Sequence, residues 1–262
     1  MSMRATRRAV TLGLLLVYCL VRSWVSRLTG PDTPQRRAQW NHSSAKLVLA
    51  ALGVRLKIIG TPPPRGLLVS NHLSYLEVLV YGAALPCFLV SKAEIARWPF
   101  FGPLARAGGT LFIDRGNRES AISVSQEISA RLQGNVPVLF FPEGTSTDGT
   151  LLRFNSRLLI PAVEAGVPVT AAAVRYVPED GSPERNLCWF GNDAFLPHLL
   201  KSLGGPNFSA EVRFGPPRIY TDRRTAANAT YKEVAAMRSA GAPILPQGAP
   251  VPAIVESQQV EG

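Results

Sequence analysis

From about residue 55 onward, the chain alternates short apolar runs with longer segments of helical periodicity. Short apolar runs bounded by Gly and Pro predict strands, and helical segments between them predict helices packed on the faces of a sheet. The predicted strands are residues 55–59, 66–70, 87–91, 109–114, 137–141, 168–175 and 210–214. The predicted helices are residues 75–84, part of 97–107, 119–132, 157–164 and 225–241, whereas 177–207 is expected to be rich in loops. The pattern therefore predicts an α/β fold.

The pattern before residue 55 is different. Residues 9–21 form an apolar run of 13 without a charge. As a helix, this run is about 20 Å long, which is shorter than the roughly 30 Å hydrocarbon core of a bilayer. A second helical stretch covers residues 35–52. We interpret both stretches as a helical anchor that lies in, or dips into, one leaflet, with a short single-pass helix as the alternative.

Charge is concentrated in the same N-terminal part. The first 57 residues contain ten Lys and Arg and one acid, a net charge of +9, whereas the remainder carries only +1. These arginines flank apolar stretches and do not alternate with base-stacking aromatics, so an anionic membrane surface is a better partner than nucleic acid. The three cysteines are far apart and predict neither a disulfide framework nor a metal site.

Three prolines at residues 62–64 form a rigid turn between the two parts of the chain. We therefore divide the chain into an N-terminal membrane anchor, residues 1–57, and an α/β domain, residues 58–242. Residues 243–262 are Pro-rich and show no periodicity. That composition predicts a disordered tail.

A polar step ends the second predicted strand. Ser70-Asn71-His72 follows the apolar run, and Glu77 comes five residues after the histidine. On one continuous helix, five residues turn the chain by about 500°, which would leave the two side chains roughly 140° apart. His72 must therefore lie in the turn before a helix, with Glu77 in its first turns. A neutral imidazole held by a carboxylate is a general base near neutral pH, although a structural histidine at a helix start fits the same spacing.

No other motif offers a competing catalytic base. His42 and His198 have no acidic or cysteine neighbour at ligand spacing, and the chain contains no H-E-x-x-H, paired C-x-x-C or G-x-G-x-x-G motif. The sequence around Ser146 does not match the G-x-S-x-G turn of a serine hydrolase.

Two further predicted strands also end in polar residues. Glu143-Gly144-Thr145 follows Pro142, and Arg115 follows the strand at 109–114. A guanidinium at such an edge can bind a phosphate through two hydrogen bonds. Taken singly, Glu143 also fits a buried structural carboxylate and Arg115 a solvated surface residue. If the sheet brings these strand ends to one edge, a base, an orienting carboxylate and an anion-binding group meet in one cleft.

In order along the chain, these motifs resemble those of the glycerolipid (lysophospholipid) acyltransferases, which include bacterial 1-acylglycerol-3-phosphate acyltransferase. The resemblance covers more than 100 residues. The matching blocks are residues 71–77 (NHLSYLE), 92–94 with 98–102 and 109–115, 141–145 (FPEGT), and 160–163 with 167–169. Two positions depart from the family pattern. Glu77 replaces the aspartate of H-x4-D, and Asn155-Ser156 follows Phe154 where the family has a basic residue.

The resemblance implies a single central mixed sheet flanked by helices, with His72 and Glu77 as the catalytic pair. It implies that Arg115, Glu143, Gly144 and Thr145 bind the acceptor. It also implies that no metal or cofactor is required and that acyl-CoA or acyl-carrier-protein is the co-substrate.

The expected reaction is acyl transfer to the free hydroxyl of a lysophospholipid. The expected acceptor is 1-acylglycerol-3-phosphate, which gives phosphatidic acid. A non-phosphate acceptor such as lyso-ornithine lipid, and a non-catalytic lipid-binding role, are the alternatives. The expected location is the inner (cytoplasmic) membrane, with the α/β domain on its cytoplasmic face.

Overall fold

A seven-stranded sheet forms the centre of the computed structural model, which describes residues 2–113 and 126–240. The strand order is β1-β7-β6-β2-β5-β3-β4. The strands are β1 (Arg55–Ile59), β2 (Leu67–Ser70), β3 (Phe88–Lys92), β4 (Leu111–Ile113), β5 (Val138–Phe140), β6 (Val169–Pro178) and β7 (Phe208–Phe214). The β6–β7 pair is antiparallel and the other neighbouring pairs are parallel, so the predicted mixed sheet is confirmed.

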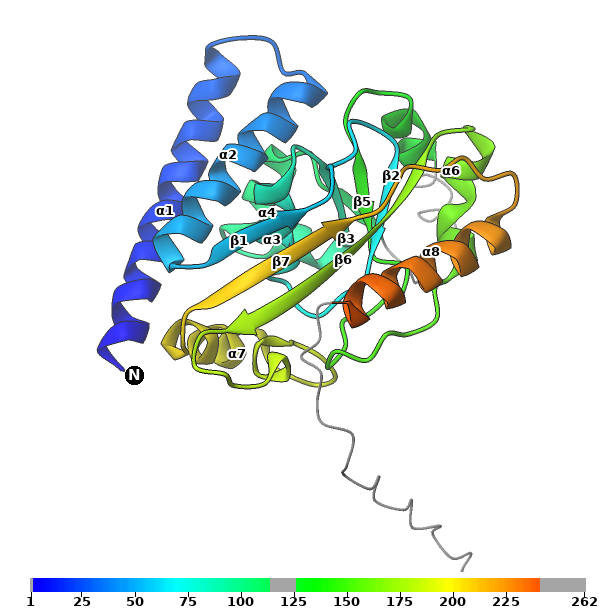
Figure 1. The fold of residues 1–262 in the computed structure, drawn as a ribbon. Coiled ribbons are helices and arrows are strands. Elements are labelled where there is room, and N and C mark those ends of the chain that lie inside the picture. Colours follow the sequence, from blue (N-terminus) through cyan, green and yellow to red (C-terminus); the bar gives the residue numbers. More distant parts are fainter. Residues whose placement is uncertain (1, 114–125, 241–262) are drawn as a thin grey trace, which may run out of the picture.

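Helices cover both faces of this sheet (Figure 1). One face packs against α2 (Pro34–Leu52) and α3 (Glu77–Ala84), and the other packs against α6 (Ile160–Glu164) and α8 (Arg223–Ser239). Alternate residues of β2 serve the two cores, because successive side chains of a strand point to opposite faces. Leu68 joins the core on the α3 side, whereas Leu67 and Val69 join the core on the α8 side.

Shorter elements complete the fold. These are α4 (Phe101–Ala107), α7 (Phe195–Gly204) and the 3-10 helices η1 (Ala93–Arg97), η2 (Ser156–Leu159) and η3 (Glu184–Leu187). The prediction that residues 177–207 are mainly loop was wrong at α7. Leu199 and Leu203 lie one helical turn apart there, and both pack in a small core with Leu12 of α1 (Met3–Leu28). The predicted helix at 119–132 lies partly outside the described residues, and its described part, 126–132, is helical.

The N-terminal helix α1 is longer than its apolar run. It has 26 residues, which corresponds to about 39 Å. By length and composition, α1 is sufficient to cross a membrane, and little of its apolar segment is buried within the protein. It packs against α2, α4 and α7, so this helix is part of the folded body (Figure 1). Buried Arg8 fixes its N-terminal half by donating hydrogen bonds to the carbonyl oxygens of Leu203 and Gly205.

One face of α1 leaves a row of large apolar side chains exposed. These residues recur every three or four positions, as expected for a single helix face. The exposed stripe consists of Val10, Leu14, Val17, Tyr18, Val21, Trp24, Val25 and Leu28. An apolar N-terminal helix with this stripe indicates membrane association.

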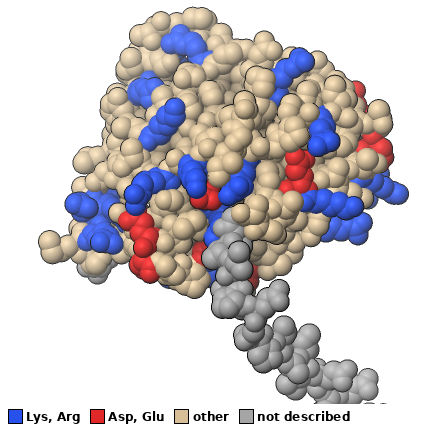
Figure 2. Space-filling view, viewed as in Figure 1, with Lys and Arg blue, Asp and Glu red and all other residues tan. Residues whose placement is uncertain are grey.

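Several basic residues of the N-terminal part are engaged by other side chains of the protein. Arg22 donates hydrogen bonds to the hydroxyls of Ser43 and Ser44 on α2, and Arg37 forms an ion pair with Asp32. Figure 2 shows Lys and Arg scattered over the face in view, with Asp or Glu beside several of them. This face of the molecule therefore has no single basic patch.

Candidate active site

The site begins where the chain leaves the sheet after β2. Asn71 accepts a hydrogen bond from the Val174 N–H at 2.9 Å and donates one to the Val174 carbonyl at 3.1 Å. Its side-chain amide thus replaces the next step of the β2–β6 ladder, whose last backbone pair is Ser70 with Ala172. The Val174 N–H and C=O of β6 thus keep hydrogen-bond partners where the chain turns away from the sheet. His72 lies in this turn.

His72 and Glu77 meet as the spacing predicts. Glu77 is the first residue of α3, and its Oε2 lies 2.6 Å from His72 Nδ1. The Glu77 carboxylate is fully buried. It also accepts the backbone N–H groups of Leu73 and Ser74 and the hydroxyl of Tyr176. Four hydrogen-bond donors therefore offset the cost of burying this charge.

The contact fixes which nitrogen of His72 can act as a base. An ionised carboxylate only accepts hydrogen bonds, so Nδ1 carries the proton and Nε2 keeps its lone pair. The imidazole stacks on Phe141 with ring centroids 4.2 Å apart and is 22% exposed. None of the described residues forms a hydrogen bond with Nε2, which leaves this atom available to a substrate hydroxyl.

The turn after β5 holds the backbone of His72. Strands β2 and β5 are parallel neighbours, so their carboxyl ends lie together. Glu143 Oε1 accepts the His72 N–H at 2.7 Å, and Oε2 accepts the Leu152 N–H at 2.7 Å. On the other side of the peptide, the His72 carbonyl accepts the N–H of Thr147 at 2.9 Å. The catalytic candidate is therefore fixed at both its N–H and its C=O.

These contacts bear on the predicted substrate-binding residues. Both Glu143 oxygens accept hydrogen bonds from backbone N–H groups, so this residue is placed to position His72. The predicted contact of Glu143 with the acceptor stays a prediction. Burial raises the pKa of Glu143 to about 7. Gly144 has a φ of 78°, a positive value that glycine adopts without strain, and Thr145 is exposed. Arg115 lies outside the described residues.

The strand before Arg115 can still be placed. β4 is parallel to β2, and two strands, β5 and β3, lie between them. Three strand spacings separate the carboxyl ends of β2 and β4 by roughly 14 Å.

The other two histidines bind backbone groups. His42 Nδ1 lies 2.8 Å from the Gly82 carbonyl oxygen, and His198 Nε2 lies 2.9 Å from that of Cys188. His198 Nδ1 also lies 3.0 Å from the Tyr75 hydroxyl, in the turn that carries His72. Tyr75 is part of an aromatic cluster that joins this turn to α7 and α4, formed with Trp98, Phe101, Trp189, Phe195 and His198.

A cavity of about 580 Å³ lies elsewhere in the molecule. Its walls come from α2 and from the segments just before β2, β3 and β5, among them Pro62–Pro64, Pro86 and Asn135. These segments are at the amino ends of the strands, whereas His72 is at a carboxyl end. The cavity is thus not the site of the His72 chemistry. Among residues 2–113 and 126–240, no group of three His, Cys, Asp or Glu is placed to hold a metal ion.

Several residues of the site were missed by the sequence reasoning. Tyr176 lies 99 positions from Glu77 and one residue beyond the predicted end of its strand. Had the predicted strand been extended by one residue, the alternation of side chains along a strand would have placed Tyr176 on the same face as Ala172 and Val174. The pairing of Asn71 with Val174 has no sequence signal, because it depends on the β2–β6 neighbourhood.

Comparison with known proteins supports an enzyme of lipid acylation. A family model described as Acyltransferase matches residues 57–175. The chain is 38% identical over 217 residues to the lyso-ornithine lipid O-acyltransferase of Pseudomonas aeruginosa, covering 80% of this chain and 83% of that one. It is 35% identical over 173 residues to the 1-acyl-sn-glycerol-3-phosphate acyltransferase of Neisseria gonorrhoeae, covering 62% and 68%.

A solved structure shares the fold. The crystal structure of the 1-acyl-sn-glycerophosphate acyltransferase PlsC from Thermotoga maritima superposes with a TM-score of 0.64. The alignment covers 89% of this chain and 97% of that one at 18% sequence identity. At this identity, the likeness concerns the fold alone.

Proposed function

Since this chain belongs to the acyltransferase family and acylates lysolipids, we propose that His72 is its general base and that Glu77 orients the imidazole. The observation that carries this proposal is the 2.6 Å contact between Glu77 Oε2 and His72 Nδ1, which leaves Nε2 accessible. A base of this kind takes the proton of a hydroxyl as the hydroxyl attacks.

The acyl group passes directly from donor to acceptor. The acceptor oxygen attacks the thioester carbonyl of acyl-CoA or acyl-carrier-protein while its proton moves to His72 Nε2. The tetrahedral intermediate then collapses, the carbon–sulfur bond breaks, and the imidazolium returns the proton to the leaving thiolate. The absence of any described serine or cysteine bonded to Nε2 supports transfer without an acyl-enzyme. No step in this scheme needs a metal or a cofactor.

The preferred acceptor in this proposal is a lyso-ornithine-type aminolipid. The similarity to the Pseudomonas aeruginosa enzyme is the more extensive of the two reported above, at 80% of the chain. The turn from residue 142 to 152, which approaches His72, contains no Lys or Arg. Its Asp148 is paired with Arg185 at 2.9 Å. At this turn, a phosphate dianion could accept hydrogen bonds from hydroxyl and N–H groups, but the turn itself supplies no cationic side chain to bind it.

The second candidate acceptor is 1-acylglycerol-3-phosphate, with Arg115 binding its phosphate. The similarity to the Neisseria gonorrhoeae enzyme supports it. β4, which precedes Arg115, ends on the same edge of the sheet as β2. The intact His72–Glu77 contact argues against the third interpretation, a lipid-binding protein without catalysis.

Membrane attachment through α1 completes the proposal. The exposed stripe of α1 would be buried in lipid, and the remaining Lys and Arg of the N-terminal part would contact anionic headgroups. We place the α/β domain on the cytoplasmic face of the inner membrane.

The test is an acceptor comparison with the full-length protein purified in detergent. Labelled acyl-CoA and acyl-carrier-protein are each offered with lyso-ornithine lipid, 1-acylglycerol-3-phosphate and neutral lysolipids, and His72→Ala serves as the blank. A higher kcat/KM for lyso-ornithine lipid supports the first acceptor. A higher value for the phosphate, with a raised KM in Arg115→Ala, selects the second. No transfer from either donor to any acceptor would refute the catalytic proposal.

A further inference from the structure

We propose that Tyr176 is a positioning residue whose hydroxyl holds the Glu77 carboxylate and thereby sets the basicity of His72. This inference rests on the proposed role of His72. The Tyr176 hydroxyl donates a hydrogen bond to Glu77 Oε1, while Oε2 accepts from His72 Nδ1. The two oxygens of one buried carboxylate are thus divided between the tyrosine and the catalytic histidine.

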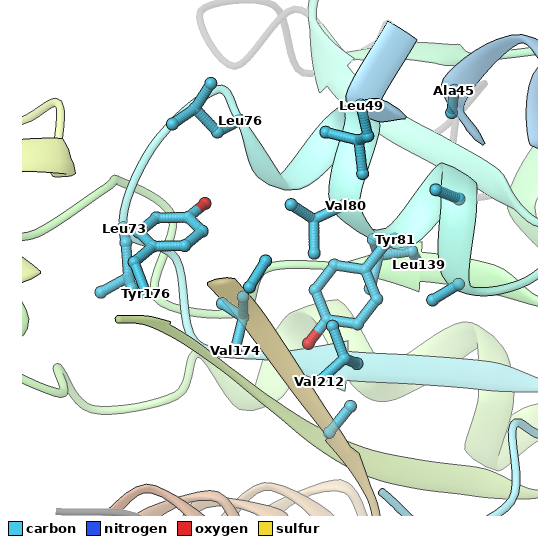
Figure 3. Close-up of a cluster of buried hydrophobic side chains, with 14 of the residues drawn as sticks. Ala45, Leu49, Leu73, Leu76, Val80, Tyr81, Leu139, Val174, Tyr176 and Val212 are labelled. Atoms are coloured by element: carbon cyan, nitrogen blue, oxygen red, sulfur yellow. The ribbon is translucent and has the colours of Figure 1, made fainter. Parts of the chain in front are cut away.

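The length of β6 brings Tyr176 to this place. Ser70, the last residue of β2, pairs with Ala172, and β6 continues beyond it to Pro178 with β7 alone as its partner. Because side chains alternate along a strand, Tyr176 lies on the same face as Ala172. That is the face covered by α3, and Figure 3 shows the Tyr176 ring beside Leu73, close to the turn that runs to Leu76.

Tyr176 is a permanent donor in this position. Its side chain is buried, and burial together with the neighbouring Glu77 carboxylate raises the pKa of Tyr176 well above its usual value. The phenol therefore stays protonated at neutral pH. Its hydrogen bond withdraws negative charge from Glu77 and moderates the attraction between the carboxylate and the His72 imidazolium.

The hydroxyl also explains how a glutamate serves where the family resemblance leads one to expect aspartate. Glu77 begins α3, which is packed against the sheet, so the position of its Cα is fixed. An aspartate carboxylate would be withdrawn by about 1.5 Å, one carbon–carbon bond. From there it could not keep both the contact with His72 and the contact with Tyr176. Glu77 and Tyr176 thus act as a matched pair.

Other titratable groups face the same cluster and do not account for this coupling. Glu143 contacts the backbone N–H of His72, and Glu184 is paired with Arg238 at 2.8 Å. Burial raises the pKa of Cys188 to about 12, and it also raises that of Tyr81. All five groups are retained when the Tyr176 hydroxyl alone is removed.

Tyr176→Phe tests the proposal, with Tyr81→Phe as the matched control. Tyr81 is also fully buried in the core on the α3 side, but its hydroxyl contacts Ser70. The pKa of His72 is measured by NMR in full-length protein labelled at histidine, with its signal assigned by comparison with His72→Ala. We expect Tyr176→Phe to raise the pKa of His72 by at least half a unit. We also expect it to lower kcat roughly tenfold with an unchanged KM for the acceptor, whereas Tyr81→Phe changes neither quantity.

A double-mutant cycle with Glu77→Asp gives a second measurement. If the two residues are a matched pair, Glu77→Asp lowers kcat much less in the Tyr176→Phe protein than in the wild type. Independent, additive effects, or an unchanged pKa of His72 in Tyr176→Phe, would overturn the inference. The NMR measurement does not require turnover, so the two proposals can fail separately. A wild-type protein that acylates no lysolipid would refute the proposed function, whereas the pKa of His72 in Tyr176→Phe would still test the role of Tyr176.

Discussion

The carboxylate of Glu143 accepts the backbone N–H of His72 at 2.7 Å, so a side chain from the turn after β5 holds the turn after β2. The same carboxylate accepts the Leu152 N–H with its other oxygen. This contact joins two loops at the backbone of His72, between residues that are 71 positions apart in the sequence. The ionised form of Glu143 is the one suited to both contacts.

Glu143 makes the stability of the protein depend on pH in a defined direction. Burial raises its pKa to about 7 in the folded chain, from an ordinary value of 4.5. Between these values the unfolded chain has lost this proton and the folded chain still holds it. The free energy of unfolding therefore contains a contribution that falls as the pH rises from 4.5 to 7 and is constant above that.

Glu143→Gln removes this contribution. We expect urea denaturation at a series of pH values from 5 to 8 to show a flatter dependence in the variant than in the wild type. Glutamine offers one acceptor oxygen, so one backbone N–H loses its partner and kcat should fall about tenfold through misplacement of His72. The same pH slope in both proteins would show that the carboxyl of Glu143 does not titrate in this range.

His72→Ala should abolish most of the activity and leave the fold intact. Loss of a general base lowers kcat by about 10² to 10⁴. The ring is partly exposed, but its removal takes one of four hydrogen-bond donors from the buried Glu77 carboxylate, so it should lower the free energy of unfolding by about 1–3 kcal/mol. His42→Ala removes an imidazole that bonds the Gly82 carbonyl and should retain wild-type kcat. Comparable activity in both variants would contradict the assignment of the base.

Asn71→Ala should destabilise the protein and reduce its activity together. The Val174 N–H would be left buried without an acceptor, which lowers the free energy of unfolding by about 1–3 kcal/mol. Since His72 is the next residue, kcat should fall as well. Asn155→Ala, which removes an exposed amide that accepts the Arg157 N–H, is the control and should lose less stability. Chemical denaturation and initial rates measure both effects, and equal losses in the two variants would argue against the ladder-replacing role.

Two substitutions on the exposed stripe of α1 should release the protein from membranes. Each Leu or Val buried in lipid contributes about 1.5–3 kcal/mol, and a glutamate in its place adds a charge that resists burial. We expect Leu14→Glu with Val21→Glu to move the protein from the membrane pellet to the soluble fraction, as judged by quantitative immunoblot. Ile219→Glu makes the same kind of change at an exposed site outside α1 and should leave the protein in the pellet. Retention of the double variant in the pellet would contradict insertion of the stripe.

Most of the strands were predictable because they are short, mainly apolar runs close to Gly or Pro residues, whereas β1 and β7 alternate charged and apolar residues. β1 was predicted at its observed bounds, and the other strands differ from theirs by three residues or fewer at either end. α7 was missed because its helical spacing is interpretable only once Leu199 and Leu203 are seen against α1. The length of α1 was underestimated because Arg8 and Arg22 end the apolar run on either side. In the structure the helix continues through both residues, and they donate hydrogen bonds to Leu203 and Ser44.

The geometry of the His72–Glu77 pair could also be predicted, because five residues fit a turn followed by a helix start and do not fit one helix. The partners that stabilise the pair could not. Tyr176 lies on β6 and Glu143 follows β5, and both contact the His72–Glu77 segment only because these strands are neighbours of β2. The order of strands in a sheet cannot be predicted from local hydrophobic periodicity. The resemblance alone suggests that aspartate is tolerated at position 77, whereas the contact with Tyr176 leads us to expect a loss of activity.

The aromatic cluster has a consequence for how the acceptor arrives. It links the His72 turn to α7 and α4, and both of these helices pack against α1. If the stripe of α1 is inserted in lipid, as proposed, the reacting edge lies at the bilayer surface, and we expect a lysolipid to reach it by lateral diffusion in two dimensions. The rate should then follow the mole fraction of lysolipid in the bilayer, so diluting the acceptor with inert lipid at constant bulk concentration should slow the enzyme.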